Sequence, residues 1–210
     1  MIFTACGLFS QAVFSGILSK KEEISVVSAK ELAKYIIMLI KKQMNTIQPE
    51  EFDVTPLKLQ KLLYYCQGYS LALTGKPAFP EPIEAWKYGP VVNSVYQEYK
   101  KYNGGIIPID KIISNNCIDE TTSAIARMVV DYKGRLSGTT LANATHKEKP
   151  YLLSYSKPYQ NSVIPENIIK EFFTEEILKL EEADDDEDNF WMSAGKSVST
   201  EKLESAIAEI

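Results

Sequence analysis

The stretch "TPLKLQKLLYYCQGYSLALTG", residues 55–75, predicts one long helix. Thr55 suits the N-cap, Pro56 suits the first helical position because its missing N–H is not needed there, and Gly75 suits a left-handed C-terminal cap. Between these ends, apolar side chains occur on almost every side of the helix. Because such a helix is usually buried nearly all round, we expect residues 56–74 to run through the middle of the fold. Its second face must then be covered by the rest of this chain or by another protein.

Two small residues of this helix carry further information. Gly68 costs about 1 kcal/mol relative to alanine inside a helix, which predicts that another backbone comes close to it. The segment "WKYGPVV", residues 86–92, is our candidate for that backbone. Cys66 lies on the apolar stripe and is one of three widely spaced cysteines. We therefore expect a buried free thiol and a cytoplasmic protein.

The remaining pattern predicts a helical protein. Capping residues and apolar residues at helical spacing predict five further helices, which begin near Ser28, Pro90, Asp119, Ser137 and Pro165. Residues 83–92 have the character of extended chain, and residues 147–163 that of a loop. We expect an all-α or mostly α fold: a single helical bundle around the central helix (56–74), with at most a small two-stranded β element near 83–92.

Charge and composition divide the chain into three parts. Seven of the 28 acidic residues lie in "EEADDDED", residues 181–188, which has the composition of a solvated linker. We predict an N-terminal extension at 1–26, a helical domain at 27–180, and an acidic linker with a short amphipathic helix at 181–210. Without the acidic run, 21 acidic residues face 23 basic ones, of which only two are arginines. This balance disfavours a nucleic-acid surface.

The apolar N-terminus, "MIFTACGLFSQAVFSGIL", is the one place where a membrane segment is conceivable. It lacks the basic region with which a signal peptide begins, and polar residues interrupt it. A spanning helix needs about 20 mainly apolar residues. We therefore expect a peripheral helix or an extension here, and no membrane partner.

The sequence offers little for catalysis. His146 is the only histidine, so any serine or cysteine mechanism that needs an imidazole must use it. Its alternative roles are to complete hydrogen bonds at a helix end or to form part of a binding surface. One histidine and no Cys-x-x-Cys pair disfavour a zinc site, and no glycine-rich phosphate loop is present. We expect no catalytic residue, no metal and no cofactor.

A family resemblance rests on residues 55–102, "TPLKLQKLLYYCQGYSLALTGKPAFPEPIEAWKYGPVVNSVYQEYKKY". This segment closely resembles the signature of the Panacea domain family, also called SocA-like or phage-associated GepA-like. Three further segments resemble its opening helix, its closing element and its final helix: "VSAKELAKYII", "LANATHKEKPY" and "VIPENIIKEFF". Tyr151 stands where the family usually has tryptophan. The resemblance extends from about residue 27 to about residue 175.

The resemblance implies an antitoxin of a toxin–antitoxin pair, of the kind found on phages and other mobile elements, which neutralises a cognate toxin by direct protein contact. One branch of the family acts instead as a proteolytic adaptor that hands its toxin to an AAA+ protease. An enzyme that uses His146 and a DNA-binding autorepressor are weaker alternatives.

The partner-binding candidates combine the polar residues of the central helix with aromatic anchors of the kind that dominate protein interfaces. They are Lys58, Gln60, Lys61, Tyr64, Trp86, Tyr88 and His146. From the residues alone, the aromatic side chains could equally fill the core of this chain.

Overall fold

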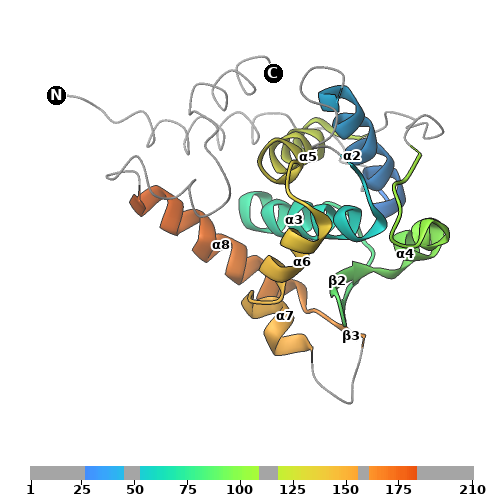
Figure 1. The fold of residues 1–210 in the computed structure, drawn as a ribbon. Helices are drawn as coiled ribbons and strands as arrows, with labels where there is room; N and C mark the ends of the chain where they lie inside the picture. The colour runs from blue at the N-terminus through green and yellow to red at the C-terminus, as the bar shows by residue number, and fades with distance from the viewer. Residues whose placement is uncertain (1–26, 45–52, 109–117, 156–160, 184–210) are drawn as a thin grey trace. The chain divides into compact units, whose positions relative to one another are not determined.

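The computed structural model describes residues 27–44, 53–108, 118–155 and 161–183 (Figure 1). Residues Ser25–Phe173 form one compact unit, and Met1–Ile24 with Thr174–Ile210 form a second. Of the second unit, only the C-terminal part of one helix, 174–183, is described. The predicted N-terminal extension and C-terminal amphipathic helix lie outside the described residues, and the predicted domain boundaries stay predictions.

The described chain is mostly α-helical with a small antiparallel sheet, which confirms the predicted fold class. The helices are α2 (Ala29–Met44), α3 (Pro56–Thr74), α4 (Asn93–Tyr99), α5 (Glu120–Lys133), α6 (Gly138–Thr145), α7 (Lys149–Ser154) and α8 (Glu166–Ala183), with a 3₁₀ turn η2 (Lys100–Tyr102) after α4. The strands are β1 (Ile83–Trp86), β2 (Gly89–Val92) and β3 (Ser162–Val163), in the order β2-β1-β3.

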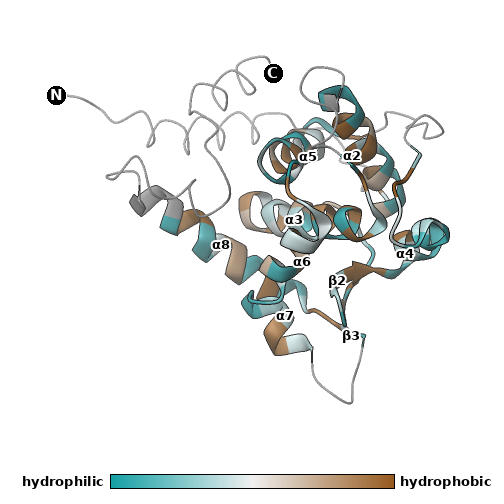
Figure 2. Ribbon diagram, in the orientation of Figure 1, coloured by the Kyte–Doolittle hydropathy of each residue, from teal (hydrophilic) through white to brown (hydrophobic). Residues whose placement is uncertain are grey.

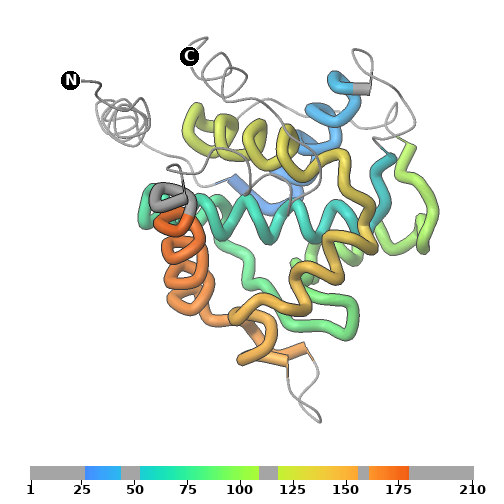
Figure 3. Tube along the Cα trace, turned by 60° about the vertical axis from the view of Figure 1, so that its left-hand side comes forward, coloured from blue at the N-terminus to red at the C-terminus, as the bar shows by residue number. Residues whose placement is uncertain are grey.

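The central helix α3 has the predicted bounds and both predicted caps. The Thr55 side chain accepts a hydrogen bond from the Lys58 N–H, and Gly75 adopts a left-handed φ of 72° while its N–H bonds to the Leu71 carbonyl. Helices α2, α4, α5 and α6 and strand β2 all pack against α3, with α5 on one side and the hairpin on the other (Figure 3). The chain itself therefore covers both faces of the helix.

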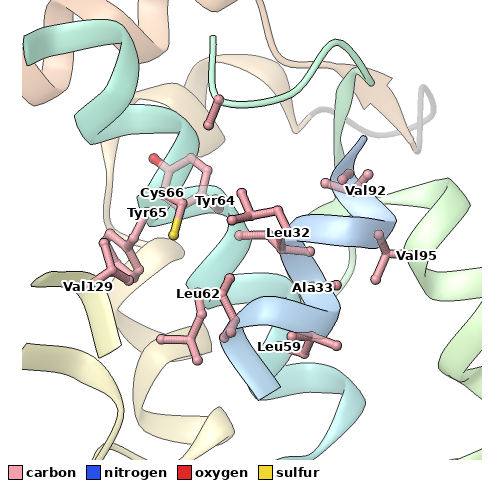
Figure 4. Packing of buried hydrophobic residues seen from close by; sticks show 14 of the residues in the cluster. Leu32, Ala33, Leu59, Leu62, Tyr64, Tyr65, Cys66, Val92, Val95 and Val129 are labelled. Atoms are coloured by element: carbon pink, nitrogen blue, oxygen red, sulfur yellow. The ribbon is translucent and has the colours of Figure 1, made fainter. Parts of the chain in front are cut away.

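A single apolar cluster joins these elements. Figure 4 shows Leu32 of α2, Leu62 of α3, Val95 of α4 and Val129 of α5 within it, all buried. Cys66 is a free, buried thiol, as predicted, and burial raises its pKa well above the ordinary value. Such a thiol behaves as a small apolar side chain rather than as a nucleophile.

The helix predicted to open at Pro90 is wrong at its start. Pro90 lies in β2, which pairs with β1 in a register that sets Ala85 opposite Pro90 and Trp86 opposite Gly89, and α4 begins only at Asn93. The fixed φ of proline is compatible with both a helix start and an extended strand. Here pairing with β1 decides for the strand.

The segment predicted as a loop at 147–163 contains two short elements. Helix α7 places Pro150 in its first turn, where proline is tolerated. Strand β3 adds a third strand to the predicted two, because Ser162 and Val163 pair with Ala85 and Glu84. Elements of six and two residues are too short for apolar periodicity to reveal them.

Gly68 is in close contact, but with a different neighbour from the one predicted. A Cβ at this position would lie 2.2 Å from a ring carbon of Phe173 on α8, and the backbone of residues 86–92 is not among the nearest atoms. The Phe173 ring also packs edge-on against Tyr64, Tyr65 and Tyr69, at centroid distances of 5.5, 5.9 and 5.0 Å. The glycine therefore makes room for an aromatic ring.

Candidate functional site

The turn of the β1–β2 hairpin consists of two residues, Lys87 and Tyr88, followed by Gly89. Gly89 has a φ of 95°, a backbone conformation that other residues rarely adopt. A Cβ there would also lie 2.7 Å from Lys61 Nζ and 2.8 Å from Thr145 Oγ1. The hairpin turn thus rests directly on side chains of α3 and α6, with no space for a larger residue.

Two polar side chains of α3 hold the backbone of β2. Lys61 Nζ donates a hydrogen bond to the Pro90 carbonyl at 2.8 Å. Gln60 Nε2 donates to the Val92 carbonyl at 3.3 Å, while Gln60 Oε1 accepts from the Val92 N–H at 2.7 Å. Because it satisfies both backbone groups of one residue, Gln60 acts on β2 as a neighbouring strand would.

Gln67, two turns further along α3, holds the chain that leads into β1. Its Oε1 accepts hydrogen bonds from the N–H groups of Ala78 and Phe79, at 2.9 and 3.3 Å, and its Nε2 donates to the Phe79 carbonyl at 3.2 Å. The buried polar residues of α3 thus satisfy backbone groups of a segment that would otherwise be buried without partners.

The carboxylate of Glu148 interacts electrostatically with Lys61. Glu148 Oε1 accepts a hydrogen bond from the Tyr65 hydroxyl at 2.7 Å. Burial lowers the pKa of Lys61 to about 7, and the charge of Glu148 acts in the opposite direction. Burial also raises the pKa of Tyr64, and Glu148 raises it further. The ammonium, the carboxylate and the two tyrosines form one electrostatically coupled group in the interior.

The corner between α6 and α7 closes the site from the other side. His146 follows the last residue of α6, forms a hydrogen bond with the backbone of Lys87, and lies with its ring 4.7 Å from that of Tyr151. Burial and the nearby charge of Lys61 lower the pKa of His146. The Tyr151 hydroxyl donates to the Trp86 carbonyl at 2.9 Å. The residue that differs from the family pattern therefore bonds to the backbone at the hairpin turn.

We call the set Gln60, Lys61, Tyr65, Glu148 and Tyr151 the hairpin lock. Of the seven predicted partner-binding residues, Lys58, Gln60, Lys61 and Tyr64 are buried. Trp86 and His146 are half-buried, and the Trp86 ring lies 4.8 Å from that of Tyr96 and donates from Nε1 to Glu84. Tyr88 is the one candidate of the seven that is largely exposed.

Direct contact between these seven residues and a partner is not tested by the structure and stays a prediction. Sequence reasoning did not assign roles to Tyr65, Glu148 and Tyr151. They lie in the segments "LLYYCQG" and "THKEKPY", which carry the family resemblance, but a motif does not distinguish a residue that supports a surface from one that forms it.

The described residues lack two kinds of feature. They contain no group of three or more histidine, cysteine, aspartate and glutamate residues arranged to hold a metal ion. Within the same ranges, no helix has the length and apolar character needed to cross a membrane. The absence of a metal, a cofactor and a catalytic residue remains a prediction for the chain as a whole.

The fold and the lock define a mostly α-helical protein in which polar residues of a buried central helix fix a β-hairpin. Residues 59–151 match the family described as "Antitoxin SocA-like, Panacea domain". This part of the chain, less than half of its length, thus matches the family that the sequence resemblance predicted.

The chain is also similar to Antitoxin SocA of Caulobacter vibrioides (strain NA1000 / CB15N). It is 29% identical to this chain over 107 residues, which cover 46% of this chain and 56% of the relative. The match thus spans little more than half of the relative's length. No solved structure matches the chain.

Proposed function

We propose that this protein is the antitoxin of a toxin–antitoxin pair and that it neutralises its cognate toxin by direct protein–protein binding. The observation that carries the proposal is the family match at residues 59–151, together with a relative named as an antitoxin. The matched residues include every member of the hairpin lock. The part of the chain that resembles antitoxins is thus the part that positions the hairpin.

The geometry of the lock supports a binding role. A surface that is already ordered before it meets its partner avoids the entropy loss of ordering it during binding. The hydrogen bonds of Gln60 and Lys61 to β2, and of Tyr151 to β1, fix the hairpin from two sides. Tyr88 is left exposed at the turn, where a tyrosine can contribute a large contact area and a polar tip.

We assign a supporting role to His146 rather than the role of a general base. Its contacts are with the Lys87 backbone and the Tyr151 ring, and its Nε2 is buried without a hydrogen-bond partner among the described residues. A base must reach the proton that it removes. This placement suits a residue that supports the turn.

Co-expression with the product of the adjacent gene tests the proposal. We expect that product to arrest growth alone, and this protein to restore growth and to co-purify with it. The His146→Ala variant should lose protection only as far as it loses toxin binding, whereas an enzyme that depends on His146 would keep binding and lose protection. A neighbouring product that is harmless alone, or that stays toxic beside this protein, would show the proposed function to be wrong.

A further inference from the structure

Three exposed large hydrophobic residues belong to the hairpin turn and to α7. Tyr88 in the turn is 61% exposed, and Leu152 and Leu153 in α7 are 59% and 62% exposed. The described part of the chain has three other exposed residues of this kind: Ile106, Val163 and Leu178. Figure 2 shows the hydrophobic residues in the C-terminal half of α7. Leu152 and Leu153 are not part of the apolar cluster formed by the described residues.

The turn and α7 are held side by side. The Tyr151 hydroxyl bonds to the Trp86 carbonyl, and Lys87 and Tyr88 follow directly. The ring of Tyr151 in turn contacts that of His146, which bonds to the backbone of Lys87. In Figure 1, α7 and the strands β2 and β3 occupy the same part of the compact unit. Helix α7 is therefore attached to the hairpin turn through Tyr151, and Leu152 and Leu153 follow Tyr151 directly in the sequence.

Three lysines lie close to these apolar residues in the sequence. Lys87, Lys147 and Lys149 are exposed. Glu148, between two of these lysines, points inward and accepts the hydrogen bond of Tyr65. The sequence "KEK" thus directs its positive charges to the surface and its negative charge to the interior. We name the turn–α7 surface as the set Lys87, Tyr88, Lys147, Lys149, Leu152 and Leu153.

We propose that the turn–α7 surface is where the toxin docks, through a face of the toxin that has an apolar centre bordered by carboxylates. This inference rests on the proposed function. An apolar centre with charges at its edge is the usual anatomy of a protein interface, and opposite charges steer association and set orientation. Tyr88 could stack on a base, but the two leucines cannot, so the surface fits a protein better than a nucleic acid.

Binding of the full-length chain to the purified product of the adjacent gene tests this surface. We expect Tyr88→Ser and the double change Leu152→Ser with Leu153→Ser each to raise Kd by roughly tenfold or more, as is typical of central interface residues. We expect Lys147→Glu to slow association severalfold and to weaken the salt dependence of the rate.

The controls make the same chemical changes elsewhere in the compact unit. Ile106→Ser replaces a residue that is 54% exposed, and Lys101→Glu reverses the charge of an exposed lysine after α4. Both controls should bind as the wild type does. All the altered residues are exposed, so thermal unfolding of every variant should match the wild type. A variant that unfolds early is replaced by the milder change Tyr88→Phe or Leu153→Ala at the same position.

The outcomes separate this inference from the proposed function. If the wild-type chain does not bind the product of the adjacent gene, the proposed function is wrong. If the wild type binds and the turn–α7 variants bind equally well, the proposed function stands and the inference is wrong.

Two other occupants of the surface can be detected in the same experiments. A single-stranded oligonucleotide that loses affinity in the turn–α7 variants, while toxin binding is unchanged, would assign the surface to a nucleic acid. Replacing the acids of 181–188 by their amides tests the chain's own acidic run. Faster hydrogen exchange of α7 on this change, with toxin affinity unaffected by the turn–α7 variants, would assign the surface to that run. Either result would overturn the inference.

Discussion

Lys61 is the residue for which burial has the clearest measurable consequence. Its pKa is about 7 in the folded chain, against about 10.4 in an unfolded one. Between these values the unfolded chain holds the proton more tightly, so stability rises with pH across this interval, by up to about 1.4 kcal/mol per pH unit. The charge of Glu148 raises the pKa of Lys61 and so reduces this rise in stability. Above about pH 10 an unfolded tyrosine ionises while buried Tyr64 stays protonated, so stability falls again with pH.

We predict that Lys61→Met makes the rise in stability between pH 7 and pH 9.5 shallower, while Lys58, whose pKa burial lowers to about 8, keeps part of that rise. Urea unfolding of the wild type and the variant at several pH values in this range measures the slope. Lys101→Met removes an exposed lysine and should leave the slope unchanged. Parallel stability profiles for the wild type and Lys61→Met would contradict the assignment.

Gly68 and Phe173 form a second residue-scale test. Gly68→Ala gains about 1 kcal/mol of helix propensity but sets a methyl group against a buried ring, and overpacking typically costs 1–3 kcal/mol. We therefore predict a net loss of about 1 kcal/mol in the free energy of unfolding. In Phe173→Leu the same alanine fills vacated space, so adding Gly68→Ala should be stabilising there. A double-mutant cycle by urea unfolding measures this coupling, and simple additivity would contradict it.

At the scale of elements, the hairpin is docked on α3 mainly through Gln60. In Gln60→Met the buried N–H and C=O groups of Val92 lose their partners, at a cost of about 1–3 kcal/mol for each unsatisfied group. We predict that the variant is destabilised by about 2–4 kcal/mol and that the Val92 amide exchanges its hydrogen much faster. Gln97→Met, at an exposed position of α4, is the matched control. Unchanged protection of the Val92 amide would show that Gln60 does not hold β2.

The elements that sequence reasoning predicted correctly are those fixed by local signals. Helix α3 has Thr55 and Gly75 at its ends, and Asp119 and Ser137 accept hydrogen bonds from backbone N–H groups at the starts of α5 and α6. Helix α7 and strand β3 depend instead on partners distant in sequence. Pro90 fits a helix start and a strand equally well, and its pairing with Ala85 across the hairpin turn decides for the strand. The close contact of Gly68 could be predicted from its helix propensity. Its neighbour, Phe173, could not, because it lies far away in the sequence.

At the scale of the whole molecule, the sequence shows which residues match the family signature. It does not show which of them support the fold and which form its surface. Lys61 and Tyr88 are both signature residues, yet one is buried and the other exposed. A single sequence does not distinguish them, because a lysine is exposed in most proteins and a tyrosine can be either. The sequence also does not reveal that Glu148 points inward, because the two lysines that flank it are exposed.

The last prediction concerns the acidic C-terminal part and separates neutralisation by binding from delivery to a protease. A chain that ends at residue 183 keeps the whole of α8 and the compact unit Ser25–Phe173, and with them every residue of the hairpin lock and of the turn–α7 surface. If protection arises from binding alone, this shortened chain should protect as well as the full chain does, and toxin should accumulate in a complex with either.

Immunoblotting of tagged toxin after synthesis is stopped measures this directly. An adaptor that uses its C-terminal part would give rapid toxin loss with the full chain and stable, bound toxin with the shortened one. A shortened chain that unfolds at a lower temperature would instead show that the tail contributes to stability. In that case, comparing the binding of purified toxin by both chains decides between neutralisation by binding and delivery to a protease. Equal, long toxin lifetimes with both chains would exclude delivery through the tail and leave binding by the shared part of the chain as the source of protection.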